Sequence, residues 1–253
     1  MTPSRWNRRR RAMYVGLAIL GGVTVAASAT PTDGISLVGD SYAIETGGEE
    51  FRVIDLYAKF SLGGWNVLFN AYNSEISLLG GGTWVHNDLA GSCPGGSWLP
   101  ALTPSLVAND SFVTIGATLP GMTNATIIDP LFVATPACSS SLGAGAGWVN
   151  PDFAQAVQGL AKSNTLHDGS TLDASVLIGR FVIDSSAPLN SVLSVNTISF
   201  TYYANSFIPT THAGVSGSFA YVPAPGCGAV LGVALVAKRR SRGRLPGAAA
   251  SWT

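Results

Sequence analysis

Apolar and polar residues alternate with a period of two along much of this 253-residue chain. In the segment 51–60, every second residue from Ile54 to Phe60 is apolar, and Arg52 opens the same side. Successive side chains of a β-strand point to opposite faces, so this pattern predicts strands. Strands are expected at 51–60, 66–72, 83–86, 112–118, 176–183, 192–202 and, as a final edge strand, 215–221.

Glycine and proline separate these segments, with breaks at 63–64, 80–82, 94–96, 120–121 and 143–147. One helix is expected after Asn150, which would cap it, with Pro151 in its first turn and Phe153, Val157 and Leu160 on one face. Many short strands with such turns predict an all-β sandwich, and we expect a jelly-roll-like one. This one short helix and an apolar helix at each end of the chain would accompany it.

Charged residues are unevenly distributed along the chain. Five of the 14 Lys and Arg lie in 5–11 and five in 238–244, whereas all 14 acidic residues lie between Asp33 and Asp184. The part between the two basic ends therefore holds four cations and 14 carboxylates, a net charge of −10. It offers no basic stripe for phosphate groups, so no nucleic-acid partner is expected.

The first 29 residues have the three parts of a secretory signal peptide. Residues 5–11 are basic, residues 12–26 are mostly apolar, and Ala27 and Ala29 form the small-x-small cleavage site. An uncleaved membrane anchor is the alternative. We expect cleavage because the apolar run is short for a hydrocarbon core of about 30 Å.

The segment 222–244 also has three parts. Pro223 and Pro225 break the chain, 227–237 is a run of eleven small or apolar residues, and Lys238, Arg239 and Arg240 begin a basic cluster. As a helix, that run would extend about 16 Å, roughly half of a bilayer. The basic cluster would stay cytoplasmic.

This arrangement resembles the sorting tail of PEP-CTERM proteins. In that family an exosortase in the inner membrane recognises and removes the tail, so the resemblance implies export machinery and an exosortase-type sorting protease as partners. The family motif has Glu where this chain has Ala224, and residues 245–253 continue past the basic cluster. A weak tail anchor is the alternative. The segments 51–57, 86–88 and 110–116 are also similar to exported planctomycete-type proteins with this tail, a similarity that implies no particular activity.

The chain is thus expected to contain a signal peptide (1–29), a β-sandwich domain (30–221), a sorting tail (222–244) and a short extension (245–253). Its expected location is the cell envelope or the extracellular side, with membrane association only through the terminal segments. If the tail is removed, Cys227 leaves with it, and Cys93 and Cys138 remain as a pair. In an oxidising compartment they would form a disulfide worth about 3–4 kcal/mol in the chain-entropy model. Two separate buried thiols are the alternative.

No catalytic motif stands out in the sequence. Gly39-Asp40-Ser41 is similar to the nucleophile block of SGNH-type esterases, but Ser41 would need a histidine to activate it and an acid to orient that histidine. The late Asp-x-x-His pair of those enzymes is missing, so Gly39-Asp40 is interpreted as a turn. A secreted hydrolase is the alternative function, and a cleft that gathers Asp40, His86 and Asp88 would favour it.

Metal ligands are sparse. None of the three histidines has a second ligand at zinc spacing, and 86–88 and 167–169 are interpreted as polar turns. Calcium is the one cofactor with candidate ligands, and a solvated acidic surface is the alternative. Those ligands are Asn87, Asp88, Asn109, Asp110 and Asp168.

Four tryptophans follow a glycine within two residues, which places them beside loops. They are Trp65, Trp84, Trp98 and Trp148. Their flat rings could stack on sugar rings, so polysaccharide is a candidate partner, and burial in the core is the alternative. The sequence therefore favours an exported structural or binding protein of the cell envelope or extracellular matrix over an enzyme.

Overall fold

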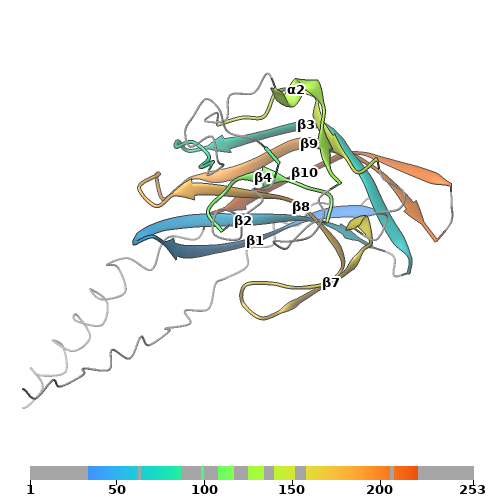
Figure 1. Cartoon of the computed structure of the whole chain (residues 1–253), viewed down its shortest axis with the longest axis horizontal. Helices are drawn as coiled ribbons and strands as arrows, with labels where there is room; N and C mark the ends of the chain where they lie inside the picture. Colours follow the sequence, from blue (N-terminus) through green and yellow to red (C-terminus); the bar gives the residue numbers. More distant parts are fainter. Residues whose placement is uncertain are drawn as a thin grey trace, which may run out of the picture.

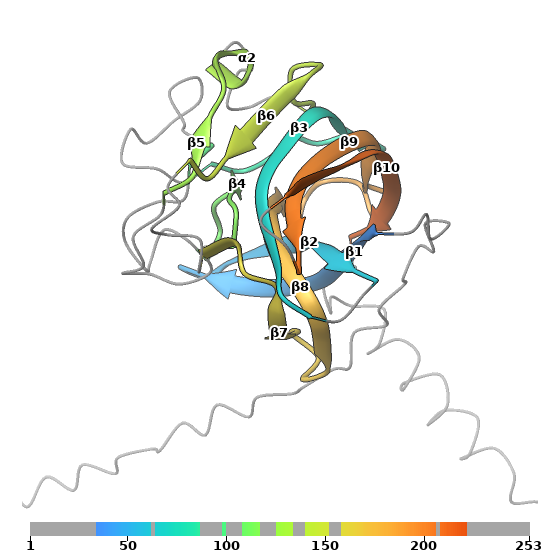
Figure 2. The same cartoon turned by 90° about the vertical axis from the view of Figure 1, so that its right-hand side faces the viewer.

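The computed structural model describes residues 34–61, 64–86, 98–99, 108–116, 125–133, 140–151, 158–205 and 208–221. These residues form two antiparallel β-sheets that pack face to face (Figures 1 and 2), which confirms the all-β prediction. In sheet A the strand order is β1 (Ile35–Thr46), β2 (Glu49–Phe60), β8 (Thr171–Asp184) and β4 (Phe112–Val113), and β7 (Lys162–Thr165) also pairs with β8. In sheet B the order is β10 (Pro209–Ala220), β9 (Val192–Ala204), β3 (Asn66–Leu79), β6 (Ala146–Val149) and β5 (Ile127–Ile128). One helical turn, α2 (Pro130–Val133), follows β5.

The period-two pattern decides which side chains enter the core between the sheets. Ile54 and Leu56 of β2 are completely buried, as are Ile198 and Phe200 of β9, and all four belong to one cluster. Burial of each such side chain stabilises the fold by about 1.5–3 kcal/mol. The inward side of β2 is the one that the sequence predicted.

Arg52 lies on this inward side as predicted and is fully buried. Its guanidinium donates hydrogen bonds to the carbonyls of Asp184, Ala187 and Pro188 in the connection between β8 and β9. A buried cation is costly unless hydrogen bonds compensate, and here three main-chain oxygens accept hydrogen bonds from the two terminal nitrogens of the guanidinium. The arginine thereby ties the end of sheet A to the crossing into sheet B.

Some connections, including the one from β7 to β8, are hairpins within one sheet, and others cross between the sheets. Gly47 and Gly48 join β1 to β2 with φ of +66° and +84°, as a two-residue turn requires. The chain also forms a hairpin from β9 to β10, whereas it changes sheet between β2 and β3 and between β8 and β9. The finer jelly-roll assignment stays a prediction.

Several local interpretations are wrong. The strand expected at 112–118 is shorter than predicted, since β4 ends at Val113 and residues 114–116 are not in a strand. Gly39 and Asp40 are not in a turn but inside β1, opposite Leu56 and Asp55. Glycine is suited to this strand because a Cβ on Gly39 would lie 2.6 Å from the ring of Phe219 in β10.

The segment 83–86 is not a strand, since it contributes only a bridge between Trp84 and Ile183. The main-chain N–H of Val85 also donates to Val182 at 2.8 Å. Three glycines with positive φ, Gly80–Gly82, precede this segment and redirect the chain after β3.

The helix expected from Asn150 falls largely on 152–157, outside the described residues. Its expected last residue, Leu160, instead forms a β-bridge with Val67, and the N–H of Ala161 donates to Asn66 at 2.9 Å. The predicted apolar helices at the two ends also lie outside the described residues. Within the described residues, no helix has the length and apolar character needed to cross a bilayer.

Candidate functional site

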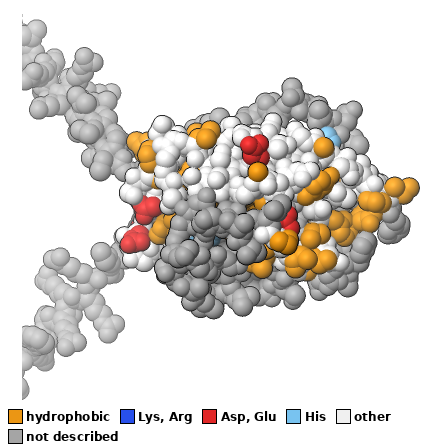
Figure 3. Space-filling view, turned by 90° about the horizontal axis from the view of Figure 1, so that it is seen from above, with side chains coloured by type: hydrophobic (Ala, Val, Ile, Leu, Met, Phe, Trp, Pro, Cys, Tyr) orange, Lys and Arg blue, Asp and Glu red, His pale blue; other side chains and the backbone are white. Residues whose placement is uncertain are grey.

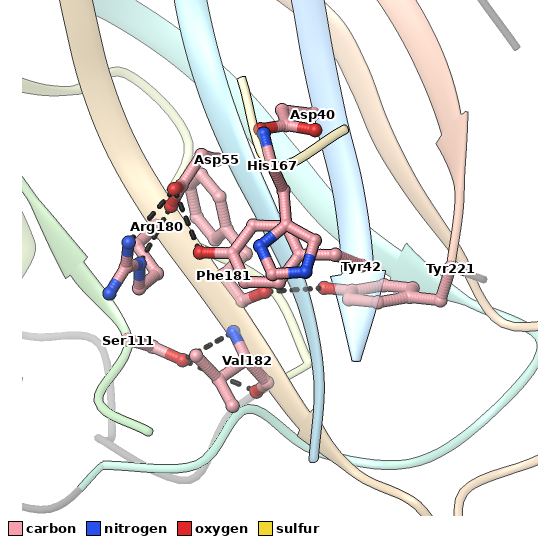
Figure 4. Close-up of polar contacts among 9 residues, drawn as sticks. All are labelled: Asp40, Tyr42, Asp55, Ser111, His167, Arg180, Phe181, Val182 and Tyr221. Atoms are coloured by element: carbon pink, nitrogen blue, oxygen red, sulfur yellow. Dashed lines mark hydrogen bonds and ion pairs between the residues drawn. The ribbon is translucent and has the colours of Figure 1, made fainter. Parts of the chain in front are cut away.

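Five side chains form a polar cluster on the outer face of sheet A, which we call the sheet A cluster. It consists of Asp40, Tyr42, Asp55, Arg180 and His167 (Figure 4). The two-residue period places Asp40 and Tyr42 on the same face of β1, and strand register sets Asp40 opposite Asp55 and Asp55 opposite Arg180. Three adjacent strands thus bring together residues that lie far apart in the sequence.

The carboxylate of Asp55 is the centre of the cluster. It accepts two hydrogen bonds from Arg180, from Nε at 2.7 Å and from Nη2 at 2.8 Å, and a third from the Tyr42 hydroxyl at 2.9 Å. The guanidinium of Arg180 also lies 5.7 Å from the centre of the Phe112 ring, in a cation–π contact. Bidentate pairing of this kind offsets the cost of burying the two charges.

Asp40 holds the β7–β8 loop against the sheet. Its Oδ2 accepts the main-chain N–H of His167 at 2.7 Å, and the imidazole of His167 stacks on the Tyr42 ring at 4.2 Å. Burial raises the pKa of the Asp40 carboxyl, and the nearby charge of Asp55 raises it further. In the loop itself, Asp168 accepts the N–H of Ser170 at 2.8 Å, which confirms the polar turn predicted at 167–169.

The sheet A cluster joins strands and a loop of the same chain to one another. The carboxylates of Asp40 and Asp55 are almost fully buried and engage groups of the protein itself. Among the described residues, no group of three or more His, Cys, Asp or Glu side chains could hold a metal ion. We therefore infer that the cluster has a structural role and holds the β7–β8 loop against sheet A.

The residues that a hydrolase would need, Asp40, Ser41 and His86, lie in different environments. Ser41 lies within β1 opposite Ile54, on the inner face of the sheet, whereas Asp40 lies on the outer face. The imidazole of His86 is buried 3.9 Å from the carboxylate of Asp110 and packs edge-on against Trp98. Asp88 lies outside the described residues, so its placement stays untested.

Three of the four tryptophans are core residues, which corrects their interpretation as sugar-stacking residues. Trp84, Trp98 and Trp148 are each at most 2% exposed, so their faces are not available to a ligand. Trp84 and Trp98 pack edge to face at 5.3 Å, and the indole N–H of Trp148 donates to the carbonyl of Thr114 at 2.9 Å. Trp65 differs, because 42% of its surface is exposed.

Asn205 fixes the main chain of Trp65 from both sides. The N–H of Trp65 donates to Oδ1 of Asn205, and the N–H of Asn205 donates to the carbonyl of Trp65, both at 2.7 Å. Sequence reasoning did not find Asn205. The feature that could have identified it is an Asn soon after the strand expected at 192–202. Asn is common in turns because it tolerates a positive φ, which is +49° at Asn205.

Other predicted sites lie outside the described residues and stay predictions. They are the cleavage site at Ala27 and Ala29, the tail residues Pro223, Pro225, Lys238, Arg239 and Arg240, the cysteines Cys93 and Cys138, and the calcium candidate Asn87. Of the other calcium candidates, Asn109 and Asp110 are buried and Asp168 is exposed.

Comparisons with protein-family models, with curated protein sequences and with solved structures find no match to this chain. The interpretation of the site therefore rests on its own geometry.

Proposed function

We propose that this chain is an exported protein of the cell envelope or extracellular matrix, with a structural or binding role and no catalytic one. The observation that carries this proposal is the charge layout: 14 carboxylates are confined between Asp33 and Asp184, and ten of the 14 cations lie in two short terminal runs. Terminal basic runs beside apolar segments are typical of signals read by export and sorting machinery.

We further propose that the tail at 222–244 is a PEP-CTERM-like signal recognised by an exosortase-type protease. In this proposal the apolar segments at both ends are membrane-associated helices until processing, and the body between them is a jelly-roll-like sandwich. The hydrogen bonds of Tyr221 support a body that extends to the residue before the proposed tail. Its N–H donates to Ser191 and its hydroxyl to the carbonyl of Phe181, so the chain is anchored up to the start of the tail.

Cell fractionation with intact-mass measurement of the natural protein tests this proposal. We expect a product outside the cytoplasm that lacks residues 1–29 and has lost mass at the C-terminal end. Replacing Ala27 and Ala29 with leucine should preserve the N-terminal segment, and replacing Lys238, Arg239 and Arg240 with alanine should prevent tail processing. A cytoplasmic product that still carries both ends would contradict the proposal.

A further inference from the structure

The two sheets differ sharply in charge. The strands of sheet A contain all four Lys and Arg residues found between the basic ends, together with seven carboxylates. The five strands of sheet B contain no Lys or Arg and a single carboxylate, Glu75. Figure 3, seen from above, shows mostly neutral and apolar side chains on the described surface, with a few groups of acidic side chains among them and apolar ones gathered toward one end. An acidic protein thus presents one nearly uncharged sheet.

The outer faces also differ in exposure. On sheet A, Val53 and Val182 are completely buried and Tyr57 is 5% exposed. On sheet B, Val67 and Phe69 of β3 are also buried, whereas Ile127 in β5 is 51% exposed and Trp65, which directly precedes β3, is 42% exposed. Many antiparallel sheets have one solvated face, so exposure alone does not indicate a site. What distinguishes sheet B is the arrangement of the side chains on that face.

Aromatic residues gather at one end of this outer face. Tyr203 is opposite Val67 in the register, and its ring packs edge to face against Phe69, with ring centres 4.7 Å apart. Trp65 precedes Val67 by two residues and so shares its face. The contacts of Asn205 hold the Trp65 main chain in place, and Gly64 permits the close approach, because a Cβ there would lie 2.5 Å from Oδ1 of Asn205. The main chain that carries this exposed ring is thus fixed before a ligand arrives, which lowers the cost of ordering on binding.

A row of neutral polar residues lies beside these rings. Thr211, Thr201 and Asn70 are opposite one another across β10, β9 and β3, next to the row that contains Tyr203. Neighbouring strands are about 4.8 Å apart, so the row presents hydroxyl and amide groups at that interval. Such groups can both donate and accept hydrogen bonds without carrying charge.

We propose that this surface, made of Trp65, Asn70, Thr201, Tyr203 and Thr211 and called the sheet B surface, binds an uncharged polysaccharide. A sugar ring has an apolar face that can stack on Trp65 or Tyr203, and hydroxyls at its edge that the polar row can bind. Acidic glycans are disfavoured because sheet B has no cation to pair with them and the body is strongly negative. The inference rests on the proposed function, since it requires the body to lie outside the cytoplasm.

The test measures retention of the purified full chain on neutral polysaccharides (dextran, xylan and glucomannan), with alginate as the acidic comparison. We expect at least one neutral polysaccharide to bind, with little change between 0.1 and 0.5 M salt. Trp65→Ala and Tyr203→Ala should each weaken binding by about tenfold or more, as anchor residues do. Leu189→Ala is the matched control, because Leu189 is 70% exposed but lies in the β8–β9 turn, outside sheet B. Thermal unfolding of each variant checks that the fold is retained.

Three results would overturn the inference: no neutral polysaccharide retained, binding to alginate alone with loss in salt, or neutral binding that survives both aromatic substitutions. Self-association that Trp65→Ala abolishes, without polysaccharide retention, would instead assign the sheet B surface to a second copy of the chain. Failure of export appears in the fractionation experiment and is independent of these binding results.

Discussion

Asp40 is a buried carboxyl whose ionisation opposes folding. Burial raises its pKa above the ordinary value of 3.8, so the folded chain binds this proton more readily than the unfolded chain. The free energy of unfolding therefore falls as the pH rises from 3.8 through the raised pKa, and the full cost is present above it. Asp40→Asn removes the charge but keeps an oxygen for the N–H of His167. At pH 7 we expect the variant to be as stable as the wild type or more stable, with the difference vanishing toward pH 4, as measured by urea unfolding.

Asp168 provides a control of opposite sign. Hydrogen bonds from the side chain and main chain of Ser170 lower its pKa, so its contribution is present above pH 3.8 and is lost as the pH falls through the lowered value. Asp168→Asn should be slightly less stable than the wild type at pH 7. A clear loss of stability in Asp40→Asn at pH 7 would contradict the assignment of Asp40.

The ion pair between Arg180 and Asp55 is a second contact between individual residues whose effect on stability can be measured. The two side chains are 18% and 8% exposed and joined by two short hydrogen bonds. Arg180→Ala leaves the Asp55 charge buried without its partner and should cost about 3 kcal/mol in urea unfolding. Adding Asp55→Asn should restore part of that loss, because the unpaired charge is then gone. If the two losses simply add, the pair is not coupled.

At the scale of elements, the segment 158–161 packs directly on β3. A Cβ on Gly159 would lie 2.1 Å from the carbonyl oxygen of Leu68, which is main chain and cannot move aside easily. Gly159→Ala should therefore lower the free energy of unfolding by about 3 kcal/mol. Gly47→Ala is the comparison, since nothing lies within 4 Å of its Cβ and only its positive φ costs about 1 kcal/mol. Equal losses would show that this packing is looser than described.

Whether a strand could be predicted depended on the length of its alternating or apolar pattern. β2, β3, β8, β9 and β10 were predicted because seven or more residues alternate or remain apolar in each of the segments 51–60, 66–72, 176–183, 192–202 and 215–221. β1 was missed because Gly39 and Asp40 interrupt its pattern, although Phe219 fills the space over the glycine. β5, β6 and β7 have two to four residues each, too few to show a period.

For the whole molecule, the predicted Cys93–Cys138 disulfide would close a loop of about 45 residues. If it forms, reduction should lower the free energy of unfolding by about 3–4 kcal/mol. Urea unfolding with and without reductant measures this change, and Cys93→Ser/Cys138→Ser should show the reduced value in both conditions. An intact mass showing two free thiols in the exported protein would contradict the pairing.

The sequence alone determined the all-β class, the inward side of β2 and the concentration of charge, because alternation and composition are local properties of the chain. Tertiary structure decided which strands are neighbours, and alternation cannot specify this, since it sorts side chains into two faces without naming a partner strand. Asp55 and Arg180 are 125 residues apart and meet only through the β2–β8 register. The same holds for the tryptophans: a glycine before each ring signals a loop, but only packing between the sheets buries three rings and leaves Trp65 exposed.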